Sequence, residues 1–95
     1  MTLREVTERR ERILEVAGRY PVSDLRVFGS VVRGDAHAGS DVDFLIKTKP
    51  GCSLLHLGGM LQDLQDLLGC PIDLVTEDGL KPRLRDRILV EAIAL

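Results

Sequence analysis

Hydrophobic residues recur with helical spacing in two long stretches, each of which predicts an amphipathic helix. The first covers about residues 2–19, where the apolar stripe lies opposite a Glu- and Arg-rich side and is interrupted by Arg10. Tyr20-Pro21 is expected to end it, because the residue before a proline avoids the helical conformation. The second covers about residues 53–68, with a stripe made of Leu54, Leu57, Leu61, Leu64 and Leu68. A third, basic helix is expected over about residues 82–91.

Shorter apolar runs between these helices are typical of β-strands. Strands are expected over about residues 25–28, 41–47 and 71–75, with a short edge strand at about 92–95. The strand at 41–47 alternates, placing Val42, Phe44 and Ile46 on one side and Asp41, Asp43, Leu45 and Lys47 on the other. This order of elements predicts an α+β fold in which helices flank a small mixed β-sheet.

Length and composition place this fold in a single domain covering residues 1–95. The formal net charge of −2 argues against a dedicated nucleic-acid-binding module. No apolar run approaches the roughly 18 residues that a membrane-spanning helix needs. The two cysteines lack metal-binding spacing, and no secretory signal precedes them, so a reduced, cytoplasmic protein is expected.

Candidate chemistry begins with three aspartates. Asp41 and Asp43 are two residues apart on a predicted strand and so project from one face, where their like charges repel. A hard cation such as Mg²⁺ relieves this repulsion, although a solvated strand end would tolerate it too. Asp73 interrupts an apolar strand, which is unusual for a carboxylate without a partner, although an edge-strand aspartate can face water. If the two strands are neighbours, all three acids converge.

A glycine–serine pair provides a candidate phosphate site. Gly29-Ser30 directly follows a predicted strand and opens a short helical turn ending at about Arg33. Free N–H groups at a helix start suit phosphate, and Arg33 could clamp a phosphate oxygen. An ordinary strand-to-helix turn with a surface arginine would have the same sequence. Ser40 is expected to brace the turn before Asp41.

The combined motif Gly29-Ser30-Val31-Val32-Arg33-Gly34 with Ser40-Asp41-Val42-Asp43-Phe44 resembles the minimal nucleotidyltransferases of the DNA polymerase beta-like superfamily. The resemblance implies a nucleotidyltransferase fold and an Mg²⁺-dependent enzyme with ATP as donor. It makes Asp41, Asp43 and Asp73 the ligands of two Mg²⁺ ions and the catalytic acids, and Gly29, Ser30, Arg33 and Ser40 the nucleotide-binding residues. Val32 and Phe44 replace the usual alanine and leucine but remain apolar.

Members of this family are often antitoxins, which implies transfer of AMP to a tyrosine of a HEPN-domain ribonuclease toxin within a hetero-oligomer. Two alternatives stay open: an antitoxin that neutralises its toxin by binding alone, and a subunit of a small-molecule nucleotidyltransferase like the aminoglycoside enzymes. The additional C-terminal helical domain with which larger relatives bind acceptors is not found, which argues against the second.

The remaining polar residues are expected to be structural or solvated. His37 is expected in an exposed loop, His56 near a helix start, and Lys47 at a strand end. Gly58-Gly59 predicts either a kink in the second helix or a close backbone contact. The basic residues of the last helix form either a solvated face or a docking face for a partner; they are Lys81, Arg83, Arg85 and Arg87.

Overall fold

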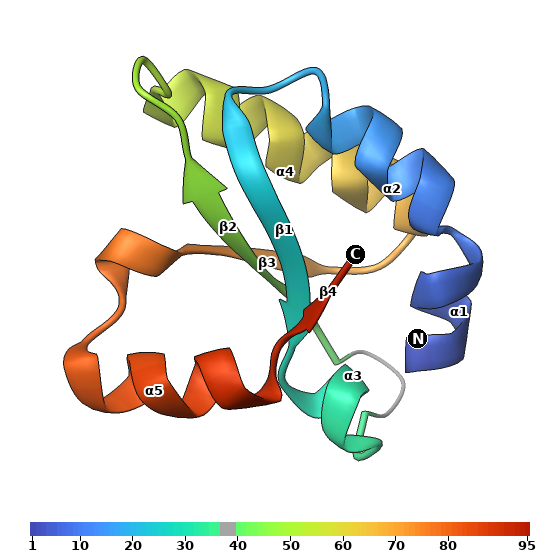
Figure 1. Ribbon diagram of the computed structural model, residues 1–95. Coiled ribbons are helices and arrows are strands. Elements are labelled where there is room, and N and C mark those ends of the chain that lie inside the picture. Colours follow the sequence, from blue (N-terminus) through green and yellow to red (C-terminus); the bar gives the residue numbers. More distant parts are fainter. Residues whose placement is uncertain (37–39) are drawn as a thin grey trace.

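The computed structural model describes residues 1–36 and 40–95, and within them four strands form one sheet (Figure 1). The strands are β1 (Val22–Phe28), β2 (Val42–Thr48), β3 (Ile72–Thr76) and β4 (Ile93–Ala94), in the spatial order β3-β2-β1-β4. β2 is parallel to β3, whereas β1 is antiparallel to both β2 and β4. The predicted α+β class with a small mixed sheet is therefore confirmed.

Helices cover the sheet unevenly. Figure 1 shows α2 and α4 side by side on one side of the sheet, and α3 and α5 beyond the opposite side. The bounds are α1 Leu3–Glu8, α2 Arg10–Ala17, α3 Ser30–Arg33, α4 Leu54–Leu68 and α5 Pro82–Glu91, with a 3₁₀ turn at Glu77–Gly79. None of the helices in the described ranges is long and apolar enough to span a membrane.

The main core lies between the sheet and the α2–α4 layer. Its fully buried members come from both, including Ile13, Val42, Phe44, Met60 and Leu64. Val42, Phe44 and Ile46, which were expected to share one side of β2, are all buried, and Leu45 on the other side is also buried. α5 contributes no buried residue, so this helix is held by other means.

The expectation of one helix over residues 2–19 is wrong, because the chain forms α1 and α2 with a break at Arg9. In an unbroken helix the Arg9 N–H would bond to the Glu5 carbonyl. Instead the Arg9 guanidinium donates to that carbonyl at 3.1 Å, and the Arg9 N–H bonds to Val6. The side chain thus competes with the backbone for the same acceptor and stops the helix.

The Gly58-Gly59 pair marks a close contact, and α4 continues through it. A Cβ built at Gly59 would lie 3.1 Å from the hydroxyl oxygen of Tyr20, whereas one at Gly58 would meet nothing within 4 Å. The Tyr20 hydroxyl also donates a short hydrogen bond to Asp63 on α4. Gly59 therefore makes room for the tyrosine that ties the end of α2 to α4.

Candidate active site

The parallel pairing of β2 and β3 brings the predicted acids to one region of the sheet. Asp43 and Asp73 are direct partners in this ladder, and Asp41 precedes β2. Paired residues on neighbouring strands project from the same face. Burial raises the pKa of Asp43, and the charges of Asp73 and Asp41 raise it further. All three carboxylates are thus close enough to interact, with Asp43 half-buried and the other two exposed.

Gly29 is fitted against the central acid of this set. The β1–β2 ladder pairs Phe28 with Asp43, so the residue after Phe28 passes beside the Asp43 carboxylate. A Cβ at position 29 would overlap the Asp43 Oδ2 atom. The backbone there also has φ of +82°, a region that L side chains rarely adopt. Both observations explain why the turn requires glycine.

The serines of the motif lie next to these residues. Ser30 is the first residue of the one-turn helix α3, so its position between Gly29 and the rest of the helix is as predicted. Ser40 is half-buried directly before Asp41.

Arg33 is bound by two carboxylates. Its Nη1 atom donates to Glu91 Oε1 at 2.8 Å and its Nε atom to Asp35 Oδ2 at 3.3 Å. The hydrogen bond to Glu91 contributes most to raising the pKa of Arg33, and the hydrogen bond to Asp35 raises it further. The second oxygen of Glu91 accepts a hydrogen bond from the Gly29 N–H at 2.9 Å. Two of the predicted nucleotide-binding residues are therefore joined by a residue that the sequence analysis did not single out.

A cleft of about 300 Å³ opens between this turn and α5. That volume is at the lower end for pockets that bind small molecules. Its walls combine predicted site residues with one face of α5 and are formed by Phe28, Gly29, Arg33, Asp43, Leu84, Arg87, Ile88 and Glu91. The α5 residues among them are spaced by three or four positions, as one helical face requires. That spacing is the signal in the sequence that could have indicated them.

The acids suit a divalent cation, but in the described parts of the chain no three acidic, His or Cys side chains already surround one metal position. Asp41, Asp43 and Asp73 supply hard oxygen donors whose mutual repulsion a cation would relieve. Mg²⁺ commonly binds through one or two protein carboxylates and completes its shell with substrate phosphates and water. The donor set is therefore compatible with Mg²⁺ arriving together with a nucleotide.

Of the other polar candidates in the described parts of the chain, only Arg87 lines this cleft. His56 accepts a hydrogen bond from the Ser53 N–H at 3.0 Å and completes a capping box at the start of α4, a structural role. Lys47 is exposed near the end of β2. Arg85 pairs with Glu77, and Arg87 lines the cleft. His37 lies outside the described residues. Both cysteines are free thiols, as expected.

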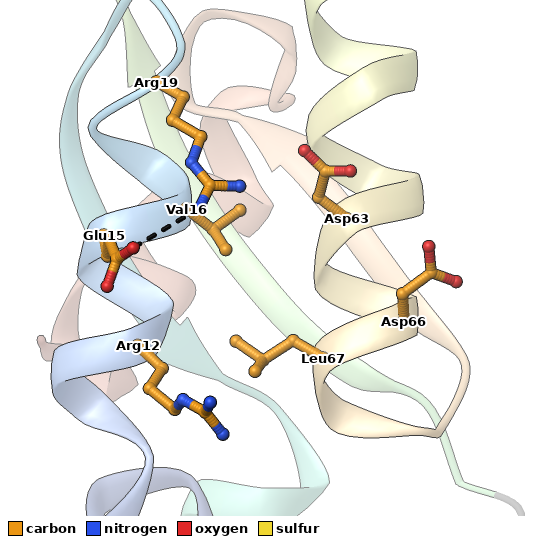
Figure 2. A pocket seen from close by; sticks show the side chains of 7 residues that line it. All are labelled: Arg12, Glu15, Val16, Arg19, Asp63, Asp66 and Leu67. Carbon is orange, nitrogen blue, oxygen red and sulfur yellow. Dashed lines mark hydrogen bonds and ion pairs between the residues drawn. The ribbon is translucent and has the colours of Figure 1, made fainter.

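A second hollow lies on the α2–α4 layer and has a different character. Figure 2 shows Arg12 on α2 and Arg19 just after that helix along one side of this groove, and Asp63 and Asp66 on α4 along the other. Arg19 is also paired with Glu15 of α2 at 3.4 Å. None of the residues predicted for catalysis or nucleotide binding lines it. The groove thus has Arg12, Glu15 and Arg19 along one side and the acids of α4 along the other, and none of the three predicted catalytic aspartates lines it.

The parallel-paired acids and the Gly-Ser turn lie on a mixed four-stranded sheet flanked by helices. A family model described as a nucleotidyltransferase domain matches residues 9–95, and the chain belongs to this family. It is 38% identical over 79 residues to the protein adenylyltransferase MntA of Thermococcus cleftensis, covering 83% of this chain and 80% of that protein. A protein of Methanocaldococcus jannaschii, provisionally named a protein adenylyltransferase, is 33% identical over 88 residues, covering 93% of this chain and 95% of that one.

Solved structures confirm the fold. A chain provisionally described as a minimal nucleotidyltransferase superposes with a TM-score of 0.89 at 43% identity, covering 100% of this chain and 97% of the other. A toxin–antitoxin structure with AMP-PNP gives a TM-score of 0.76 at 19% identity, covering 88% of this chain and 69% of the other. A Shewanella oneidensis complex of a tri-AMPylated HEPN toxin with MNT antitoxin gives a TM-score of 0.70 at 16% identity, covering 93% of this chain and 69% of the other. At these lower identities the likeness is one of fold.

Proposed function

We propose that this protein is an antitoxin that transfers AMP from ATP to a tyrosine of a HEPN ribonuclease toxin. The observation that carries the proposal is the fit of Gly29 against Asp43, whose strand partner is Asp73. A turn that only glycine can form, set against a half-buried acid, serves no evident packing purpose. The names of the relatives and the complexes of the structural neighbours supply the nucleotide and the class of acceptor.

The predicted site residues, of which Gly29, Arg33 and Asp43 line the cleft, have separable roles in this reaction. Gly29, Ser30, Arg33 and Ser40 would bind and orient the triphosphate. Asp41, Asp43 and Asp73 would hold two Mg²⁺ ions, which when bound neutralise charge on the phosphates and on the attacking oxygen. Asp73 would accept the proton of the tyrosine hydroxyl. The phenolic oxygen then bonds to the α-phosphorus, the bond from that phosphorus to the β-bridging oxygen breaks, and pyrophosphate leaves with the electron pair.

The acceptor on this proposal is a protein bound in a hetero-oligomer, not a nucleic acid. The exposed face around α5 and β4 would leave room for it, since Leu84, Val90 and Ile93 are all exposed there. A net charge of −2 gives no general attraction for nucleic acid.

The decisive measurement is the intact mass of a HEPN toxin from the same source after incubation with this protein, ATP and Mg²⁺. We expect the toxin to gain one or more AMP units and to map them to tyrosine. The Asp41→Asn/Asp43→Asn double variant should abolish the gain, whereas Asp86→Asn, on the exposed part of α5, should not. Undiminished transfer by the double variant would contradict the metal assignment. Neutralisation of the toxin without any mass gain would instead establish an antitoxin that acts by binding alone.

A further inference from the structure

Glu91 is placed unusually for an acid in a site that would bind a triphosphate. Its side chain is only 21% exposed, and charged side chains are rarely buried without a partner. Its two oxygens bind the Gly29 N–H at 2.9 Å and Arg33 Nη1 at 2.8 Å. These two partners stand immediately before α3 and at its last residue. One carboxylate from the end of α5 thus fastens both ends of the turn that carries Ser30.

Such a fastening has a physical reason, because α3 has only four residues. A single helical turn is not stable by itself, since the entropy lost in forming the first turn exceeds what its few hydrogen bonds return. Its position beside Asp43 therefore depends on tertiary contacts. Val31 supplies an apolar contact from within the turn, being only 3% exposed. Glu91 supplies the polar ones, and it does so from an element that buries no side chain of its own.

We infer that Glu91 is a positioning residue for nucleotide binding, which holds Gly29 and Arg33 so that the Ser30 turn keeps its place beside Asp43. The inference rests on the proposed function for the identity of the nucleotide. It assigns Glu91 no contact with the substrate. Its action passes through the Gly29 N–H and the Arg33 guanidinium.

Electrostatics alone predicts the opposite effect, which makes the inference testable. Removing a negative charge beside a triphosphate site should strengthen ATP binding if Glu91 had no positioning role. Loss of the fastening should weaken it. For Glu91→Ala we expect ATP affinity to fall by about tenfold, the scale of a lost charge-assisted hydrogen bond. Glu91→Gln keeps an acceptor for Gly29 but not the ion pair with Arg33, so its affinity should fall less.

The experiment measures ATP affinity by calorimetry and the exchange rate of the Gly29 amide proton by NMR in nucleotide-free protein. Asp86→Asn is the matched control, because it removes an exposed α5 charge that neither Gly29 nor Arg33 contacts. We expect Glu91→Ala to accelerate Gly29 exchange and Glu91→Gln to accelerate it less, both variants to weaken ATP binding, and the control to change neither. In an Arg33→Ala background, Glu91→Ala should have a smaller effect on affinity.

Two results would overturn the inference. One is ATP binding by Glu91→Ala that equals or exceeds that of the unaltered protein. The other is a Gly29 exchange rate that Glu91→Ala, which removes the acceptor of the Gly29 N–H, leaves unchanged. Failure of the proposed function would look different, because the unaltered protein would then not bind ATP at all. The Gly29 exchange rates would still decide whether Glu91 holds the turn.

Discussion

At the scale of single residues, Gly29 and Gly34 offer a matched pair on either side of α3. Both have positive φ, +82° and +81°, but only a Cβ at Gly29 would overlap the Asp43 carboxylate. Gly34, with ψ of 13°, is in the left-handed helical region, where alanine costs roughly 1 kcal/mol, whereas Gly29, with ψ of −151°, is in a region that essentially only glycine adopts, so alanine costs more there. We expect Gly34→Ala to lose roughly 1 kcal/mol of stability and keep AMP transfer. Gly29→Ala should in addition lose transfer by at least about tenfold, since the acid must move. Chemical unfolding and transfer rates check both; equal transfer by the two variants would show that the Gly29–Asp43 fit is irrelevant to the reaction.

Replacing Asp43 is expected to raise the stability of the fold while removing AMP transfer. Burial and its acidic neighbours raise the pKa of Asp43 above the ordinary value. Once the pH exceeds the pKa of the same carboxyl in the unfolded chain, ionised Asp43 therefore destabilises the fold. In metal-free buffer at neutral pH, Asp43→Asn should therefore melt at a higher temperature than the unaltered protein while losing transfer. The difference should shrink as the pH falls to about 3, where Asp43 is protonated in both states. Thermal melts across pH test this, and a lower melting temperature for Asp43→Asn at pH 7 would contradict it.

The sequence was informative about residues whose chemistry shows locally. Asp41 and Asp43 share a strand face by spacing, and Gly29-Ser30 stands at a strand end, so their proximity needed only one correct strand pairing. Glu91 gave no such signal because its partners lie 62 and 58 residues away in the chain. Only the return of α5 to the end of β1 gives that carboxylate a role. The ion pair of Arg33 with Glu91 could not be predicted from the sequence for the same reason.

At the scale of elements, Gly58 and Gly59 of α4 should respond in opposite ways to alanine. Nothing lies within 4 Å of a Cβ at Gly58, so Gly58→Ala should stabilise the fold by roughly 0.5–1 kcal/mol through better helix propensity. At Gly59 the new methyl would press on Tyr20 at 3.1 Å and disturb its bond to Asp63. That loss, about 1 kcal/mol, should cancel or exceed the gain.

Urea unfolding of the two alanine variants measures this difference, and Tyr20→Phe serves as the reference for the lost hydrogen bond. In the Tyr20→Phe background Gly59→Ala should be only partly less harmful, because the hydroxyl contact at 3.1 Å is gone while the contact with the ring carbon Cε1 at 3.2 Å remains. Equal stabilisation by both alanines would mean that Tyr20 moves aside freely.

Element boundaries were predictable where a strong local signal marks them. The last helix was expected over 82–91 and is found there, since Pro82 fits the first turn of a helix and the apolar pattern continues from it. The helix expected over 2–19 divides at Arg9, because a long side chain competes for a backbone carbonyl. Arginine normally favours helices, so helix propensities do not predict that the Arg9 side chain competes for a backbone carbonyl.

At the scale of the whole molecule, the two helical sides differ in how firmly they are held. α4 buries Met60, Leu64 and Leu68 in the core, whereas α5 buries nothing and contacts the rest of the site through Glu91 and the cleft walls. Segments with few buried apolar contacts open locally at low free energy. The helix layer that packs into the core thus supports the sheet that carries the acids, whereas α5, which buries no side chain, forms one wall of the cleft that Asp43 lines.

This difference between α4 and α5 predicts which amides will exchange more slowly when a nucleotide binds. Amides of α5 should exchange with deuterium faster than those of α4 in nucleotide-free protein, because opening α5 exposes almost no additional apolar surface. ATP with Mg²⁺ should slow exchange across α5, since Arg87 and Leu84 would then face a filled cleft, while α4 serves as the internal control and stays unchanged. The Asp41→Asn/Asp43→Asn variant should show little slowing. Hydrogen-exchange mass spectrometry measures all three. If the α5 amides are as protected as those of α4 without nucleotide, the cleft is preformed and α5 is a fixed wall. If ATP instead slows amide exchange in α2 and α4, the nucleotide binds the groove between those helices, and the proposed site is on the wrong side of the sheet.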